Sequence, residues 1–161
     1  MTRLLTWAEA TAIGHFMRES GPWTYAIVNV AHVLAVAALF GSVLVLDLRM
    51  LGLGRRIPLA AVSAAAVPVA GVALVLALPT GFALLATHAT DYLDNPFVLV
   101  KFPAIALGLL NVVVLNRLPG WQSRASREPS SGERRQLAVV AAISLASWTT
   151  AVVCGRMIGY W

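Results

Sequence analysis

Charged residues are scarce in this 161-residue chain, where Asp, Glu, Lys and Arg together make up 12% of the sequence. A typical soluble domain carries about 25%. A soluble helical bundle needs polar outer helix faces, and a chain with 59% hydrophobic residues has too few charges to supply them. The composition therefore excludes an ordinary soluble domain and favours a membrane protein.

Several functional signatures are absent as well. The single cysteine, Cys154, can form no intramolecular disulfide, so cysteine usage indicates no redox compartment. No metal-cluster spacing, phosphate-binding loop or nucleophile triad occurs, which favours a non-enzymatic protein. The net charge of +5 comes largely from two short loops and does not suggest a nucleic-acid partner. We also expect no cleavable signal peptide, because the first apolar run is too long and lacks a basic flank before it.

Four long apolar runs fill most of the chain. Each approaches or exceeds the ~20 residues that cross a bilayer core of ~30 Å. The runs cover Trp23–Leu46, Leu59–Ala86, Pro96–Leu115 and Gln136–Gly155. We therefore predict an all-α membrane protein with four transmembrane helices in an up-down bundle, forming a single domain over residues 1–161. Residues 118–135 are rich in Gly, Pro and Ser and are predicted to be a mobile linker.

The segment before the first run is too polar to span a membrane. It mixes apolar side chains such as Trp7 with charged ones such as Glu9 and Arg18. This composition is typical of a short helix lying on the membrane surface, with the tryptophan at headgroup depth. We predict such an interfacial helix within residues 1–21.

Loop charge predicts the orientation. The first and third loops carry eight of the 12 basic residues, and the other four lie elsewhere. Because positive charge accumulates in cytoplasmic loops, we place these two loops in the cytoplasm and both termini outside it. The basic loop residues are Arg49, Arg55, Arg56, Arg117, Arg124, Arg127, Arg134 and Arg135.

Polar groups within the apolar runs are the candidate site residues, because burying them in a bilayer is costly. Tyr25, Asn29 and His32 are spaced so that they share one helix face. Lys101 lies about one turn into the third run, and Arg156 lies near the end of the fourth. Counting along the helices at ~1.5 Å per residue puts these groups in the outer half of the bundle. They predict one polar site that takes a haem, a quinone or another small anionic ligand.

Two histidines do not suit bis-histidine haem ligation. On straight antiparallel helices, His32 and His88 would lie roughly 16 Å apart along the membrane normal. His32 as a single axial haem ligand, with Lys101 and Arg156 receiving the propionates, remains open. The alternatives are equally open: His32 as a packing residue, and the two cations extended to the lipid headgroups.

Asp47 lies near the cytoplasmic end of the first run. An unpaired carboxylate at that depth is unfavourable, and arginines follow closely in the chain. We therefore predict a boundary ion pair between Asp47 and Arg49, Arg55 or Arg56.

Three segments carry a resemblance to a known family: the run from Trp23 through "DLRMLGL", the stretch "PTGF…DNPFVLVKF…NR" and the terminal "GRMIGYW". Nearly the whole chain resembles a family of small four-helix bacterial membrane proteins of unknown function, and it is distantly similar to copper-resistance D and cytochrome b561-like bundles. The resemblance implies a bacterial inner-membrane location but no activity. The matching positions are His32, Gly41, Asp47, Leu48, Arg49, Gly52, Gly81, Lys101, Asn111, Gly155 and Arg156.

Two functional classes follow from these observations. One is a cofactor-binding electron-transfer module with haem b or quinone. The other is a non-catalytic membrane subunit, or a small-molecule-binding or transport-associated protein. The lipid bilayer is the expected partner in both, and an oligomer or a larger membrane complex stays open.

Overall fold

The structure is a computed structural model that describes residues 2–160; Met1 and Trp161, the ends of the predicted domain, lie outside the described residues. The described chain is helical and contains no strand, which confirms the predicted fold class. Its long helices are α3 (Gly21–Leu51), α4 (Leu59–Thr87), α5 (Pro96–Arg117) and α7 (Ser131–Met157), the last continued by η2 (Ile158–Tyr160). All four are long and apolar enough to cross a membrane.

The surfaces of these helices are apolar along their length. Val30, Val72 and Leu110, on three different helices, are each more than half exposed. Large exposed apolar surfaces of this kind are unfavourable in water and suit contact with lipid. The chain is therefore a multi-pass membrane protein.

The N-terminal segment forms two short helices where one was predicted. These are α1 (Thr2–Glu9) and α2 (Ala12–Glu19), and they meet at Thr11. The Thr11 hydroxyl accepts a hydrogen bond from the Gly14 amide at 3.3 Å, so Thr11 acts as the N-cap of α2. A threonine at this position satisfies an otherwise unpaired amide and starts a new helix.

The fold comprises two compact units, each containing part of α3 and part of α4. Within the described residues, unit 1 comprises residues 2–39 and Gly71–Pro96. Unit 2 comprises Phe40–Ala70 and residues 97–160.

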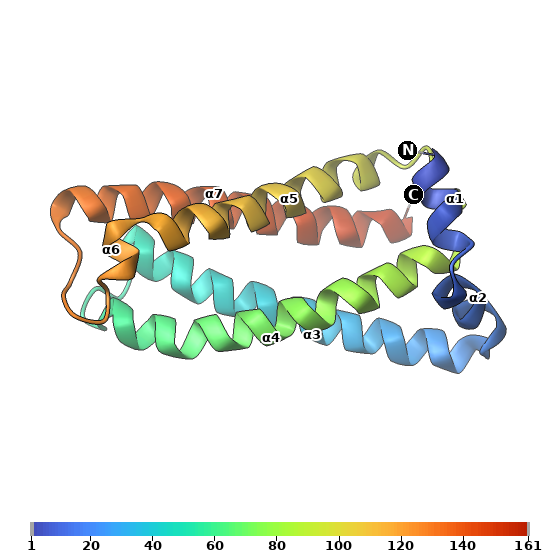
Figure 1. Ribbon diagram of the computed structural model, residues 1–161, viewed down its shortest axis with the longest axis horizontal. Coiled ribbons are helices and arrows are strands. Elements are labelled where there is room, and N and C mark those ends of the chain that lie inside the picture. The colour runs from blue at the N-terminus through green and yellow to red at the C-terminus, as the bar shows by residue number, and fades with distance from the viewer. Residues whose placement is uncertain (1, 161) are drawn as a thin grey trace. The chain divides into compact units, whose positions relative to one another are not determined.

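In unit 1, α1 packs on η1 (Ala89–Tyr92). Figure 1 shows α1 beside the end of α4. Leu5, Ala8 and Ala89 are buried together at this contact. The Glu9 carboxylate accepts hydrogen bonds from the backbone amide and the hydroxyl of Thr90, at 3.0 and 2.7 Å. These bonds stabilise the ionised form, so the pKa of Glu9 lies below its usual value.

Helix α2 contacts the C-terminal end of α4 within the same unit. The Arg18 guanidinium donates to the carbonyls of Ala86 and Thr87, at 3.2 and 3.3 Å, and to that of Glu9 at 2.9 Å. It thereby satisfies carbonyls that the end of a helix leaves unpaired. Gly14 permits the approach, because a Cβ there would lie 2.8 Å from the Ala86 carbonyl oxygen.

In unit 2, α5 and α7 lie side by side and run in opposite directions (Figure 1). Gly108 faces the Trp148 ring, which would lie 3.0 Å from a Cβ built on that glycine. The buried Asn111 side chain donates to the Val140 carbonyl at 2.9 Å. Small residues bring helices close together in membranes, and such a bond adds to their association. The core of the unit includes Leu59 and Leu137, each only 2% exposed.

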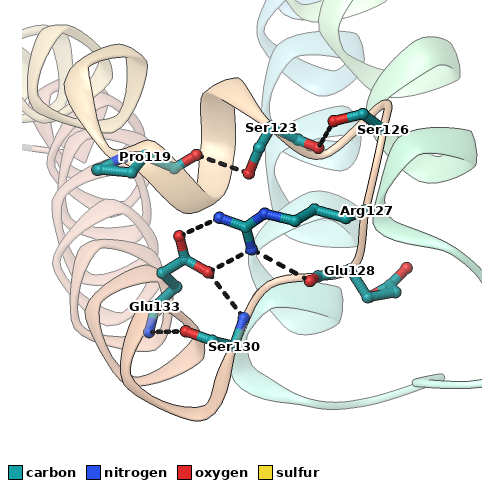
Figure 2. A network of polar contacts seen from close by, with 7 residues as sticks. All are labelled: Pro119, Ser123, Ser126, Arg127, Glu128, Ser130 and Glu133. Atoms are coloured by element: carbon teal, nitrogen blue, oxygen red, sulfur yellow. Dashed lines mark hydrogen bonds and ion pairs between the residues drawn. The ribbon is translucent and has the colours of Figure 1, made fainter.

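The predicted linker at 118–135 contains α6 (Pro119–Gln122) and the first turn of α7. Figure 2 shows a network of polar contacts in this segment, centred on Arg127 and Glu133, whose paired hydrogen bonds are both 2.7 Å long. Glu133 also accepts from the Ser130 amide at 2.7 Å, and the Ser130 hydroxyl accepts from the Glu133 amide. This capping box starts α7. The contacts with Glu133 raise the pKa of Arg127.

Candidate functional site

His32 lies on the part of α3 that belongs to unit 1, where it contacts α4. Its Nδ1 is 3.0 Å from the Thr80 hydroxyl, and that hydroxyl donates to the Leu76 carbonyl at 2.6 Å. Because the hydroxyl proton is used in this way, Nδ1 is the donor to Thr80. The ring lies over Gly81, where a Cβ would come within 2.8 Å of Cε1.

The other predicted site residues are divided between the units. Tyr25 is exposed and Asn29 half-buried, both on the same helix of unit 1 as His32. Lys101 and Arg156 belong to unit 2. The Lys101 Nζ lies 3.4 Å from where a Cβ of Gly155 would be. Arg156 is exposed and bonds the Tyr160 hydroxyl, with its guanidinium carbon 4.7 Å from the centre of the Tyr160 ring. A shared site of His32, Lys101 and Arg156 stays a prediction.

The predicted ion pair of Asp47 is wrong. Among the described residues Asp47 forms no ion pair, and Arg49 instead contacts Glu128 at 3.4 Å and the Ile57 carbonyl at 2.6 Å. The physical reason is helical geometry, because residues two apart on a helix do not face each other. Asp47 is therefore buried inside unit 2, whereas the Arg49 side chain contacts the loops.

Asp47 is instead a buried carboxyl group inside unit 2. Its side chain is 2% exposed, and the Ser144 hydroxyl of α7 is a polar neighbour of the carboxyl group. The second oxygen, Oδ2, is buried and receives no hydrogen bond within the described chain. Most buried polar atoms in proteins have a partner, so this oxygen marks a candidate site.

A second polar atom without a partner lies in the same unit. The Trp148 indole Nε1 is buried and has no acceptor among the described residues. Trp148 follows Ser144 by four residues, so the two share one face of α7. The interior of unit 2 thus contains an acceptor oxygen without a donor and an indole donor without an acceptor. No group of three His, Cys, Asp or Glu side chains gathers as a metal site in the described residues.

Comparison with known proteins identifies a family. The model of a family of unknown function, DUF6644, matches residues 4–161. The chain belongs to this family. No curated protein and no solved structure matches the chain.

The sequence analysis did not predict the polar neighbours of His32 and Asp47, which are Thr80 and Ser144. Thr80 follows Pro79 within α4, and Ser144 is one of several small polar residues on α7. Ser144 could have been selected as a candidate in the same way as Asp47, because it is a polar residue within an apolar run. Only packing shows which serine of that helix meets the carboxyl group.

Proposed function

We propose that the protein is a non-catalytic, transport-associated membrane protein that binds a proton or a small cation at Asp47. The observation that carries this proposal is the burial of a carboxyl group whose Oδ2 receives no hydrogen bond from the described residues. Ionisable residues inside membrane proteins commonly mark proton relays and ion pathways.

The surroundings of Asp47 support the need for a neutralising group. Burying an ionised carboxylate without a cation costs several kcal/mol or more. Two basic side chains of unit 2 that are close in sequence make other contacts: Arg49 pairs with Glu128, and Arg55 folds back over Gly52. Arg124 bonds the Ser63 hydroxyl and stacks on Trp121. A bound proton or a small cation removes the cost, and the Ser144 hydroxyl then serves as a neighbouring polar partner.

The test is labelling with dicyclohexylcarbodiimide, which adds to protonated carboxyl groups in apolar surroundings. The protein is labelled in membranes over a range of pH and digested, and the adduct is located by mass spectrometry. We expect an adduct on the peptide containing Asp47, decreasing as the pH rises. Sodium that slows labelling at constant pH would identify a cation as the alternative occupant.

Asp91 and Asp94 serve as internal controls, because both are exposed outside the long helices. The variant Asp47→Asn should fold and lose the label, since an amide keeps the shape of the protonated acid. Labelling of the three aspartates to the same extent would contradict the proposal, as would labelling that survives in Asp47→Asn.

A cofactor-binding electron-transfer module is the second candidate function. It is favoured by the contact of His32 with the Thr80 hydroxyl, because histidines that hold a haem iron are commonly oriented by such a hydrogen bond to the ring. Tyr25, Asn29, Lys101 and Arg156 would supply the polar surroundings of haem b or of a quinone. A Soret band that shifts on dithionite reduction, or quinone in an organic extract, would support this function. A colourless protein whose extract contains no quinone would contradict it.

The bacterial inner membrane, with both termini outside the cytoplasm, is the proposed location. Loop charge and family resemblance support it. The distant similarity to copper-resistance D and cytochrome b561-like bundles stays a prediction, as does assembly into an oligomer or a larger complex.

A further inference from the structure

We infer a binding site for a phosphate-bearing anion in unit 2, in a cavity that we call the arginine pocket. The pocket has a volume of about 440 Å³ and lies between the end of α3, the start of α4 and the first turns of α7. This volume falls within the ~300–1,000 Å³ typical of small-molecule sites. Its charged lining residues are Arg49, Arg55, Arg134, Arg135 and Glu128. The inference is independent of the proposed role of Asp47.

The charge of the pocket is unbalanced. Four arginines line it, against one acidic residue, Glu128, which is already paired with Arg49. Two other arginines nearby already have partners and serve as a comparison. Arg127 is paired with Glu133 through two hydrogen bonds, and Arg124 is stacked on Trp121, its ring centre 3.9 Å from the guanidinium carbon. The pocket arginines therefore retain capacity for an anion.

Arg49 is held in a set orientation. Its side chain is only 11% exposed, and Nε donates to the Ile57 carbonyl while Nη2 contacts Glu128. Glu128 in turn accepts from the Leu59 amide at 3.2 Å. These contacts join the segments on either side of the pocket and fix the Arg49 side chain. Its guanidinium group therefore needs little rearrangement when an anion binds.

Arg55 is placed by a glycine. Gly52 ends α3 with a φ of +112°, and a Cβ there would lie 2.7 Å from an Arg55 guanidinium nitrogen. Any other residue would be strained in this conformation and would displace the arginine. Gly52 therefore lets the Arg55 side chain fold back beside the end of the helix, where its charge faces the pocket.

The arginine side chains give the pocket its chemistry. Leu59, Leu137 and Met50 also line it, but Leu59 and Leu137 are each only 2% exposed and offer little apolar surface. Guanidinium groups bind phosphate through paired hydrogen bonds, so the phosphate is the part of a ligand that the pocket recognises. Two sources have this chemistry, the headgroup of an anionic phospholipid and a soluble phosphate compound.

The test measures anion affinity of the purified protein in a neutral detergent at low salt by isothermal titration. The probes are inorganic pyrophosphate and a short-chain phosphatidylglycerol. The pocket variant is R134Q/R135Q, and its matched control is R56Q/R117Q, which removes the same charge from two arginines of unit 2 that do not line the pocket. Circular dichroism and gel-filtration profiles establish that both variants remain folded.

We expect the pocket variant to lose about tenfold or more in affinity, as for loss of charge-assisted hydrogen bonds, and the control to lose less than about threefold. The variant E128Q should bind about threefold to tenfold more tightly, because it removes the one negative charge of the pocket. Binding of the lipid but not pyrophosphate would identify a headgroup site, and the reverse would identify a soluble ligand.

Three results would overturn the inference. The first is that the wild-type protein binds neither probe. The second is equal loss of affinity in the pocket and control variants, which would mean that the loops attract anions only through their overall charge. The third is unchanged or weaker binding by E128Q when its fold is intact.

Discussion

Glu128 offers a quantitative test of how the two arginine-rich loops are joined. It makes two contacts with different partners: its Oε1 accepts from the Leu59 amide at 3.2 Å, and its Oε2 pairs with Arg49 at 3.4 Å. The first contact acts as a cap at the start of α4, and such caps contribute about 1 kcal/mol. The Glu128 side chain is 54% exposed, so solvent weakens the ion pair to roughly 0.5 kcal/mol.

The two contacts can be separated by substitution. Glu128→Ala removes both and should lower the free energy of unfolding by about 1.5 kcal/mol. Glu128→Gln keeps an acceptor oxygen for the Leu59 amide and should lose only the ion pair, about 0.5 kcal/mol. At ~2–4 °C per kcal/mol for a chain of this size, we expect Tm to fall by about 3–6 °C in the first variant and by about 1–2 °C in the second.

The assay is thermal unfolding in neutral detergent, followed by tryptophan fluorescence at low salt and again at high salt. High salt should abolish the difference between wild type and Glu128→Gln, because it screens the ion pair, and should leave most of the effect of Glu128→Ala. Glu19→Ala serves as a control, because it removes an exposed carboxylate far from these loops in the sequence. Equal Tm values for the Ala and Gln variants would refute the capping contribution, and a wild-type Tm in both would refute the reasoning as a whole.

Three further predictions concern other parts of the chain. The lowered pKa of Glu9 means that its stabilisation of η1 is complete above the ordinary glutamate pKa of 4.5 and is lost as the pH falls through the lower folded pKa. The protection of the Thr90 amide against hydrogen exchange, relative to an unfolded peptide at the same pH, should decrease in that acidic range, and Glu9→Gln should remove this pH dependence. Gly14→Ala places a Cβ 2.5 Å from the Glu9 carbonyl oxygen and should lower stability by about 1–3 kcal/mol, measured as a fall in Tm, whereas Gly71→Ala meets nothing within 4 Å and should not. Reporter fusions at Ser130 and at the C-terminus should report opposite sides of the membrane, and a reporter at Ser130 found outside the cytoplasm would contradict the predicted orientation.

The spanning helices could be predicted from the sequence because their signal is local. Runs such as Leu59–Ala86 are apolar over their whole length, and an unpaired backbone polar group in lipid is costly enough to require a helix. The helix α4 (Leu59–Thr87) agrees with that run to within a residue. The N-terminal break at Thr11 was missed, because a single N-cap residue is a weak signal within a mixed segment.

The candidate site was only partly accessible from the sequence. Asp47 was selected because a carboxyl group in an apolar run is costly wherever it lies, but its partner was predicted from neighbours in the chain. In the structure the polar neighbour of Asp47 is Ser144 on α7, and Arg49 turns to Glu128. Likewise His32 was selected from its type and depth, and its bond to Thr80 depends on how α3 and α4 meet.

The sequence by itself determined that this chain crosses a membrane, how many helices are able to do so and which polar residues carry an energetic cost there, since each of these depends on composition within one helix. Tertiary structure decided which side chains satisfy that cost. It buried Asp47 beside Ser144 in unit 2 and gathered four arginines, from α3, the loop after it and α7, around one pocket. Those pairings depend on the rotation of each helix about its axis and on the small residues, such as Gly108, at which neighbouring helices meet. The apolar pattern specifies neither, because these helices are apolar on nearly every face.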